Sequence, residues 1–114
     1  WSCMIRADDG YAFTSPIGRF QTNAFGLHDM HGNAYEWCAD WYGETYYRDS
    51  PFDDPMGPDS GSHRVLRGGS WYLRPVNSRS VQRHKLSPDF RSNTGFRVAR
   101  TLRPPDVPRP FGQR

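Results

Sequence analysis

Residues 34–42 read AYEWCADWY, and this alternating stretch decides how the rest of the chain is interpreted. Its large apolar side chains recur at every second position, which is the period of a β-strand. One face of the strand would carry Tyr35, Trp37, Ala39 and Trp41. The opposite face would carry Glu36, Cys38 and Asp40. The sequence therefore predicts a strand that is buried through its aromatic side chains.

Two further stretches predict partners for this strand. RVLRGGSWY at 64–72 places an apolar pair, Val65 and Leu66, before two glycines, which predict a bend where backbones approach closely. We expect Trp71, which follows the bend, to anchor the core. GFRVAR at 95–100 predicts a last strand with Phe96 and Val98 facing inward.

Loops are expected to form most of the remaining chain. Residues 11–20 mix β-favouring aromatics with Pro and Gly, which predicts short extended pieces joined by a turn. One helical turn is expected at Gly26–Met30, and residues 43–64, rich in Pro, Gly, Asp and Ser, predict a long ordered loop. Residues 72–94 show no clean period, and the 4 prolines of residues 101–114 predict a tail outside the sheet.

The composition agrees with a folded, loop-rich domain. The 114 residues include 11 Gly and 10 Pro, while 4 Trp, 6 Tyr and 7 Phe supply much of the apolar mass. No run approaches the ~18 apolar residues of a membrane helix, so no membrane segment is expected. We predict one domain over residues 1–100 and a proline-rich tail over 101–114. A start without Met or a targeting segment suggests part of a longer protein.

Charge divides the chain into two halves. Residues 1–60 carry 3 basic and 10 acidic side chains, whereas residues 61–114 carry 12 basic and 2 acidic ones. The halves should therefore attract each other, and the arginines of the basic half suit forked hydrogen bonds to carboxylates and carbonyls. These arginines are spread along a Gly/Pro-rich segment that contains no recognisable nucleic-acid-binding motif, so nucleic acid is not expected as a partner. The two cysteines, Cys3 and Cys38, fit either one disulfide or two free thiols.

Three motifs, in this order, carry a family resemblance. They are NAFGLHDMHGNAYEW at 23–37, RGGSW at 67–71 and NTGFRV at 93–98, and the upstream DGY at 9–11 and TSP at 14–16 fit the same pattern. The chain resembles the formylglycine-generating enzyme or sulfatase-modifying factor domain family over roughly residues 8–100. The resemblance implies an irregular, loop-rich α+β fold related to the C-type lectin fold. The chain would be the C-terminal half of the family's domain, and its partner would be the remainder of that domain, upstream of Trp1.

The resemblance also defines what the chain lacks. The family oxidises a sulfatase cysteine to formylglycine with oxygen and a copper ion held by two cysteines, because Cu(I) prefers soft thiolate ligands. Counted back from the GFR motif, those cysteines would fall near Pro75 and Ser80, and no cysteine follows Cys38. Copper is therefore not expected. Tyr35 stands where the enzymes carry Trp beside the active site.

Calcium is the metal that the resemblance implies. In the family a loop wraps a calcium ion through main-chain oxygens and one carboxylate, and the matching positions are Asp29, Gly32, Ala34 and Glu36. The alternative is that the Glu36 carboxylate accepts hydrogen bonds from backbone amides of the turn and that no ion is bound. A second family site matches Asp9 and Tyr11, with its other ligands upstream of Trp1. His28, His31 and His84 are interpreted as loop or core histidines, because no carboxylate or thiol accompanies them in a known spacing.

Residues 71–93 form the most interesting surface. They cover the family's active-site surface and resemble the variable ligand-binding region of bacterial C-type-lectin-fold proteins diversified by retroelements. The candidate binding residues are Tyr72, Arg74, Asn77, Arg79, Arg83 and His84. Alternatively, Arg79 and Arg83 pair with the acidic half. A nucleophile built from Ser70 or Ser80 with His84 is disfavoured, because no elbow motif surrounds either serine.

The expected function follows from these observations together. We predict a domain of this family that lacks the copper-binding cysteine pair, is stabilised by calcium and binds a protein or peptide. The alternative is a formylglycine-generating oxidoreductase that acts on a protein cysteine with residues supplied upstream of Trp1.

Overall fold

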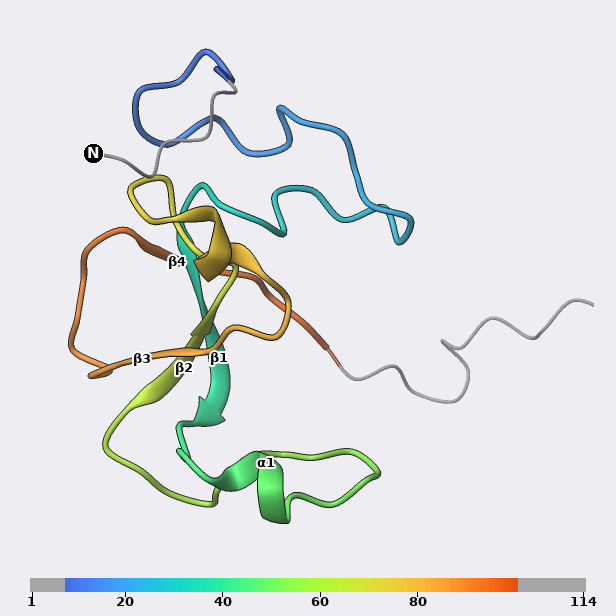
Figure 1. Cartoon of the computed structure of the whole chain (residues 1–114), viewed down its shortest axis with the longest axis vertical. Helices are drawn as coiled ribbons and strands as arrows, with labels where there is room; N and C mark the ends of the chain where they lie inside the picture. The colour runs from blue at the N-terminus through green and yellow to red at the C-terminus, as the bar shows by residue number, and fades with distance from the viewer. Residues whose placement is uncertain (1–7, 101–114) are drawn as a thin grey trace, which may run out of the picture.

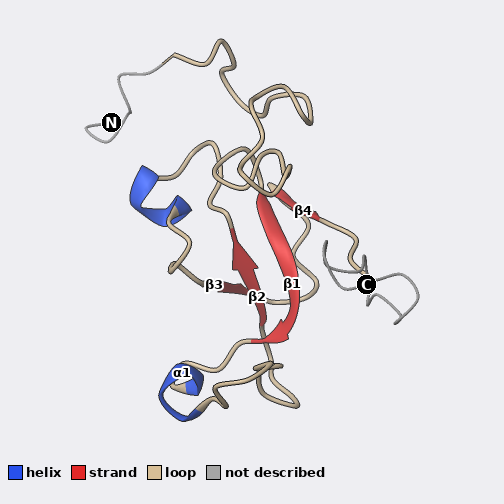
Figure 2. Cartoon of the chain, turned by 90° about the vertical axis from the view of Figure 1, so that its right-hand side faces the viewer, coloured by secondary structure: helices blue, strands red, loops and turns tan. Residues whose placement is uncertain are grey.

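Four short strands form one mixed sheet in the computed structural model, which describes residues 8–100 (Figure 1). They are β1 (Tyr35–Trp41), β2 (Arg64–Arg67), β3 (His84–Leu86) and β4 (Thr94–Phe96). Their order across the sheet is β3-β2-β1-β4. β2 runs antiparallel to β1 and β3, whereas β4 lies parallel to β1 at the edge (Figure 2). Two short helices, α1 (Tyr46–Asp49) and the 3-10 helix η1 (Pro75–Ser78), and long loops complete the predicted irregular α+β fold.

β1 forms where the alternating sequence predicted a strand. Tyr35 is buried, and Trp37 is paired in register with Leu66 of β2. The register shifts between Trp37 and Trp41, so the alternation is interrupted at the far end of the strand. There the guanidinium of Arg64 lies 3.5 Å from the centre of the Trp41 ring. The strand is therefore buried at Tyr35 and half-buried at Trp37 and Trp41.

The hydrophobic core of the described residues is small. It consists of Tyr35, Val65 and Leu66, which are 4%, 3% and 0% exposed. The Tyr35 ring stacks against His84 of β3 at 5.3 Å between ring centres and 10° between ring planes. Both side chains of the predicted β2 pair are thus buried, one on each face of the sheet.

Three expectations about the core were wrong. Trp71 is 43% exposed, and Phe96 and Val98 are 76% and 90% exposed. β4 ends at Phe96, and because it is an edge strand no neighbour covers its outer side. An apolar alternation predicts which residues share a face, but it does not predict whether anything packs against that face.

Loop predictions succeeded unevenly. Between residues 8 and 34 the structure has turns but no strand or helix: the turn expected within 11–20 forms at Ile17–Gly18, whereas the helical turn at Gly26–Met30 was wrong. Instead, a hydrogen-bonded turn links Asn23 to Gly26 and Leu27. α1 interrupts the predicted 43–64 loop, and η1 and β3 form within residues 72–94, where no period was visible. No helix among residues 8–100 is long and apolar enough to cross a membrane.

The glycine pair after β2 forms the predicted bend. Gly68 and Gly69 have φ angles of +87° and +75°, in the region that favours glycine. A Cβ on Gly69 would lie 2.3 Å from Ser78 Oγ and 3.0 Å from Ser78 Cα. The bend therefore needs glycine both for its backbone conformation and for the close approach of the segment that ends η1.

The two oppositely charged halves meet in a single ion pair between described residues. Arg97 Nη2 lies 2.6 Å from Glu36 Oε1, while the other described ion pair, Arg48–Asp49, joins neighbours within the acidic half. Most other arginine contacts are with main-chain carbonyls, including those of Arg67, Arg83 and Arg91. The arginines thus form the predicted hydrogen bonds chiefly with carbonyls.

Candidate functional site

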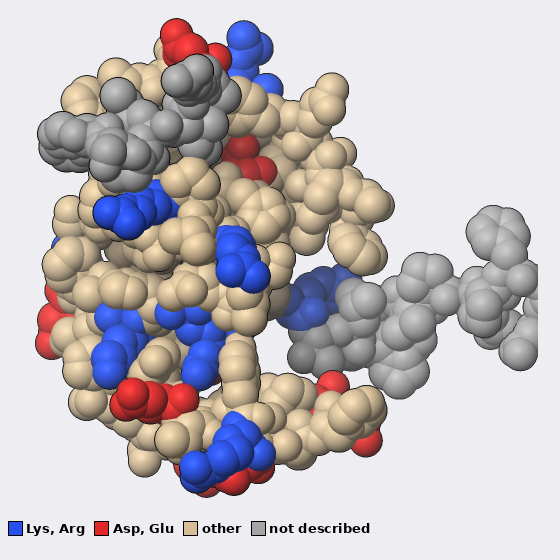
Figure 3. Space-filling view, viewed as in Figure 1, with Lys and Arg blue, Asp and Glu red and all other residues tan. Residues whose placement is uncertain are grey.

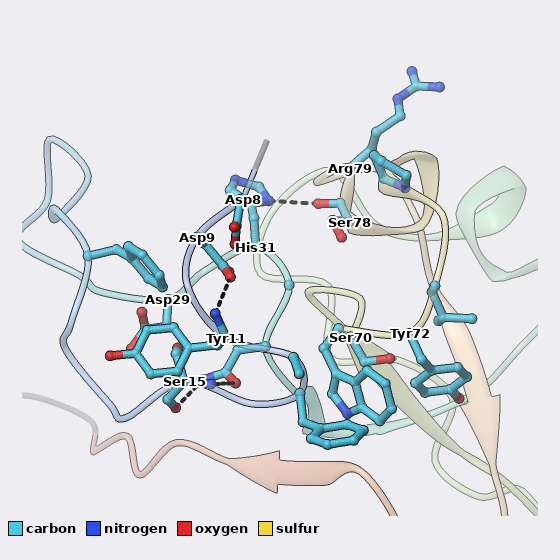
Figure 4. A pocket seen from close by; sticks show the side chains of 18 of the residues that line it. Asp8, Asp9, Tyr11, Ser15, Asp29, His31, Ser70, Tyr72, Ser78 and Arg79 are labelled. Carbon is cyan, nitrogen blue, oxygen red and sulfur yellow. Dashed lines mark hydrogen bonds between the residues drawn. The ribbon is translucent and has the colours of Figure 1, made fainter. Parts of the chain in front are cut away.

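A groove of about 1310 Å³ lies among the loops at the end of the sheet where β2 runs into the glycine bend (Figure 4). Three segments line it: the N-terminal loop, the loop before β1 and the segment that follows the bend. Its lining residues are Asp8, Asp9, Tyr11, Ala12, Phe13, Ser15, Phe20, Asp29, His31, Gly32, Asn33, Ser70, Trp71, Tyr72, Leu73, Pro75, Ser78, Arg79, Ser80 and Val81.

The loop before β1 holds the groove together. His31 Nδ1 lies 2.6 Å from the Ser78 carbonyl, as Figure 4 shows, and Gly32 N–H donates to the Gly68 carbonyl at 2.7 Å. The carbonyl of Asn33 accepts from Trp71 N–H at 2.9 Å. These contacts fix the segment after the bend against the loop before β1.

Asn33 also attaches the N-terminal loop. Its Oδ1 accepts from Ser15 N–H at 3.1 Å, and its Nδ2 donates to the Ser15 carbonyl at 3.2 Å. The φ of Asn33 is +61°, a conformation that Asn tolerates better than most residues. The HDMHGN sequence therefore joins all three lining segments.

Three buried side-chain oxygens in the described residues have no hydrogen-bond partner, and all three belong to residues that line this groove. They are Ser15 Oγ, Asp29 Oδ1 and Ser70 Oγ. Ser70 is only 3% exposed, so its hydroxyl is not solvated by bulk water. A buried unpaired polar atom costs about 1–3 kcal/mol. Their concentration in one groove marks it as a place where a bound molecule can supply the missing partners.

Aromatic side chains form one wall of the groove. Trp71 makes edge-to-face contacts with Phe13 at 5.0 Å and with Tyr72 at 5.4 Å between ring centres. These rings are 43% (Trp71), 68% (Phe13) and 45% (Tyr72) exposed, so each presents part of its surface to the groove. Behind them, burial raises the pKa of Tyr35 above its ordinary value of 10.0, and Tyr72 raises it further.

The predicted binding residues separate into two groups. Tyr72 and Arg79 line the groove, and in Figure 4 the Arg79 guanidinium projects away from the other labelled side chains. Arg74 and Asn77 lie at and within η1 but do not line the groove. Arg83 and His84 lie elsewhere: Arg83 contacts tyrosine rings near α1, and His84 stacks on Tyr35. The structure therefore does not unite these six residues on one face.

The positions expected for the family's cysteines do lie on the groove. Pro75 and Ser80 both line it, as do Leu73 and Ser78 of the same segment. In the register that places the two cysteines at Pro75 and Ser80, both positions therefore lie on the groove. Ser70 and Ser80 make no hydrogen bond with His84, which is consistent with the absence of a nucleophile elbow.

Asp29 and Glu36, the two acidic residues of the predicted calcium loop, converge on Arg97. Arg97 Nε and Nη2 both lie 2.6 Å from Glu36 carboxylate oxygens, and Nη2 donates to the Asp29 carbonyl at 2.8 Å. The bond to Glu36 raises the pKa of the Arg97 guanidinium. Asp29 Oδ2 accepts from Gly18 N–H at 2.7 Å, which leaves Oδ1 unpaired. One buried carboxylate oxygen is thus available to a hard cation, while Glu36 would share its carboxylate with Arg97.

The other residues of the two predicted calcium sites have different surroundings. Gly32 lines the groove with a φ of +80°, and Ala34 is half-buried just before β1. Asp9 and Tyr11 line the groove, but Asp9 Oδ1 accepts from Tyr11 N–H at 3.0 Å within a local turn. The described residues contain no group of three or more His, Cys, Asp or Glu side chains placed to hold a metal ion.

Sequence interpretation missed two features of the site. Ser70 had been considered only as a nucleophile, and Asn33 had been quoted only as part of a motif. Nothing in the local sequence distinguishes a buried unpaired hydroxyl from a solvated one. Cys38 is half-buried in β1; burial raises its pKa above the ordinary 9.0, Asp40 and Glu36 raise it further, and Arg67 lowers it. The predicted alternative, a disulfide between Cys38 and Cys3, involves Cys3, which lies outside the described residues.

Comparison with known proteins gives consistent matches. Residues 1–102 match the family described as sulfatase-modifying factor enzyme 1-like domain. The formylglycine-generating enzyme of Streptomyces coelicolor is 43% identical over 112 residues, covering 87% of this chain and 36% of that protein. The serine/threonine-protein kinase pkn1 of Chlamydia caviae is 42% identical over 93 residues, covering 79% of this chain and 15% of that protein.

A solved structure matches in fold as well as in sequence. Treponema denticola variable protein 1 has a TM-score of 0.67 and 40% sequence identity, with 75% of this chain and 31% of that chain covered. The chain therefore spans 36% or less of the length of each of these three proteins.

Proposed function

The chain belongs to the sulfatase-modifying factor enzyme 1-like domain family, and from that premise we propose that its groove recognises a protein or peptide without copper-dependent formylglycine chemistry. The observation that carries this proposal is the set of three unpaired buried oxygens on one groove. A ligand with hydrogen-bond donors would complete Asp29 Oδ1, which can only accept, and either serine hydroxyl can donate or accept.

The aromatic wall supports the same proposal. Phe13, Trp71 and Tyr72 expose large rigid surfaces beside the unpaired oxygens, and aromatic residues at a pocket are the usual anchors of protein recognition. The fold match to a protein named variable protein 1 agrees with the resemblance of residues 71–93 to a variable binding region. The match within a protein named as a kinase supports a module that accompanies other activities.

The absence of thiolates supports the second part of the proposal. The groove segment carries Leu73, Pro75, Ser78 and Ser80, and no cysteine follows Cys38 in the sequence. A serine hydroxyl is a poor ligand for Cu(I), and proline offers no side-chain donor. Cys38 lies in β1 and is not among the residues that line the groove.

The competing function is a formylglycine-generating oxidoreductase that acts on a protein cysteine. The 43% identity to an enzyme of that name favours it. The two functions are separated by incubating the chain with copper, oxygen and a cysteine peptide from a sulfatase. We expect no aldehyde product by mass spectrometry, and turnover would overturn the proposal.

Peptide selection tests the groove directly. A displayed random peptide library, selected on the wild-type chain, should yield peptides that lose at least tenfold in affinity for Tyr72→Ala, because truncating a binding anchor costs about 2 kcal/mol or more. Phe96→Ala is the matched control, since Phe96 is also an exposed aromatic but does not line the groove. Equal binding to both variants, or no enrichment, would contradict the proposal.

We propose in addition that calcium stabilises the loop before β1 through Asp29, Gly32, Ala34 and Glu36, with a second, partial site at Asp9 and Tyr11. The unpaired Asp29 Oδ1 supports an oxygen-rich site, since Ca²⁺ takes 6–8 oxygen ligands. At a hundredfold excess over Kd, binding would stabilise the folded chain by about 2.7 kcal/mol.

Thermal unfolding with and without chelator tests the calcium proposal. Glu36→Gln should remove most of the calcium dependence, although it also weakens the Arg97 pair and lowers the baseline. Glu44→Gln is the control, because Glu44 is an exposed acid outside the proposed sites. If the chelator leaves the melting temperature of the wild-type chain unchanged, the calcium proposal is wrong. It is also wrong if the chelator changes the melting temperatures of the two variants equally.

A further inference from the structure

Three cations gather around the side chains of Tyr42 and Tyr47, next to α1 and to the segment at Ser80 that borders the groove. Arg83 lies 4.0 Å from the centre of the Tyr47 ring and 4.9 Å from that of Tyr42, and Lys85 Nζ lies 4.9 Å from that of Tyr42. Arg67 Nη2 donates to the Tyr47 hydroxyl. We call these five residues the cationic cluster. Figure 3 shows basic side chains gathered over β2 and β3.

The cluster is held by the fold and its charge is not neutralised. Val65 of β2 pairs with Lys85 of β3, which sets Lys85 beside the buried pair of the core. No ion pair between described residues involves Arg67, Arg83 or Lys85. The nearest carboxylate in register is Glu36, opposite Arg67, and Arg97 already binds it. The three cations therefore have no carboxylate within ion-pair distance among the described residues, and acidic side chains lie beside the basic ones on this face (Figure 3).

Stacking on the tyrosine rings leaves N–H donors available in the plane of the Arg83 guanidinium and on the Lys85 ammonium. Arg83 Nη1 donates to the Gly43 carbonyl at 3.0 Å, but its Nε and Nη2 have no hydrogen bond to the described residues. Lys85 is exposed and donates none of its three N–H groups there. Because the tyrosine rings hold these cations in place, an incoming carboxylate would immobilise little further side-chain freedom.

We propose that the cationic cluster binds an acidic segment of a protein partner, at a site that borders the groove where Arg67 donates to the Ser80 carbonyl. Carboxylates suit the forked donors of arginine and the point charge of lysine. Nucleic acid fits less well, because strand binding uses aromatic faces for base stacking. Here the faces of Tyr42 and Tyr47 are covered by Arg83 and Lys85.

The proposal is tested with a fluorescein-labelled oligoglutamate peptide titrated into the full chain and followed by fluorescence anisotropy. Lys85→Glu should weaken binding about tenfold at low ionic strength, since it replaces an attraction with a repulsion. Arg19→Glu is the matched control: it makes the same change in net charge, and Arg19 lies beside Asp9, Tyr11 and Phe20 of the N-terminal loop, whose blue trace is at the far end of the molecule from α1 (Figure 1). That control should change affinity less than twofold.

Three outcomes would overturn the proposal. They are no binding of the peptide, equal losses in Lys85→Glu and Arg19→Glu, and tighter binding of an oligothymidine strand of equal length. Lys85 is chosen because it is exposed and makes no hydrogen bond to the described residues, so its replacement should leave the melting temperature unchanged. Arg83→Gln breaks the hydrogen bond to the Gly43 carbonyl and should also weaken binding of the oligoglutamate peptide. Unchanged affinity of that variant for the peptide would contradict the proposal.

Discussion

The sheet and the groove use similar residue types in opposite ways. In the β1–β2 pair, Leu66 is fully buried and Val65 nearly so, and the strands pair in an antiparallel ladder with one register shift between Trp37 and Trp41. In the groove, large aromatics are exposed and three buried oxygens lack partners. The contrast indicates that the sheet supplies stability, while the groove retains unfavourable features that a bound molecule would relieve.

Leu66→Ala should produce the largest loss of stability. Removing a fully buried leucine typically lowers the free energy of unfolding by about 2–5 kcal/mol, because the cavity cannot fully collapse. Phe96→Ala, also in the sheet and also predicted to face inward, should cost under about 1 kcal/mol, since most of that ring is already in water. Urea unfolding of both variants measures the difference. Similar losses would show that the edge strand contributes as much as the core.

Gly69→Ala should cost the next largest amount and should affect both regions. A Cβ there meets Ser78 Oγ at 2.3 Å and requires a φ near +75°, so we expect a loss of roughly 2 kcal/mol or more, with the groove displaced. Gly26→Ala is the control: its φ is +74°, but nothing lies within 4 Å of the added carbon. It should show only the backbone strain of about 1 kcal/mol. Equal melting temperatures for the two variants would contradict the close contact with Ser78.

Alkaline pH should destabilise the chain through Tyr35. Its pKa is raised above 10.0 by burial, so the unfolded state loses this proton at a lower pH than the folded state. The stabilisation is present below pH 10 and is lost as pH rises further, by up to about 1.4 kcal/mol for each pH unit. Tyr35→Phe should show a shallower decline above pH 10 in unfolding experiments at several pH values. An unchanged slope would mean that Tyr35 ionises equally well in both states.

Ser70→Ala should have the smallest effect on stability and a clear effect on the groove. The substitution removes an unpaired buried hydroxyl, so the free energy of unfolding should stay within about 0.5 kcal/mol or rise. Peptides selected on the wild-type groove should bind the variant more weakly. A strongly destabilised variant would instead show that this hydroxyl has a partner in solution, and the distinction between sheet and groove would no longer hold at that position.

The sequence was most informative where a residue's role depends on its immediate neighbours. The alternation at 34–42 predicted β1, the apolar pair predicted β2, and the two glycines predicted the bend. Each of these follows from a local period or a local backbone requirement. The short strand β3 and the helix η1 were not predicted, because three or four residues are too few to show a period.

The sequence by itself determined the family, the α+β fold and the absence of a cysteine pair after Cys38, since ordered motifs and residue identity are properties of the chain. Only the tertiary structure decided that Trp71 and Phe96 are exposed, that Arg79 lines the groove while Arg83 stacks on tyrosines, and that Ser70 is buried without a partner. Burial and pairing depend on which distant segments meet in space. The free energy of a polar or aromatic side chain is therefore decided by contacts that its own stretch of sequence does not encode.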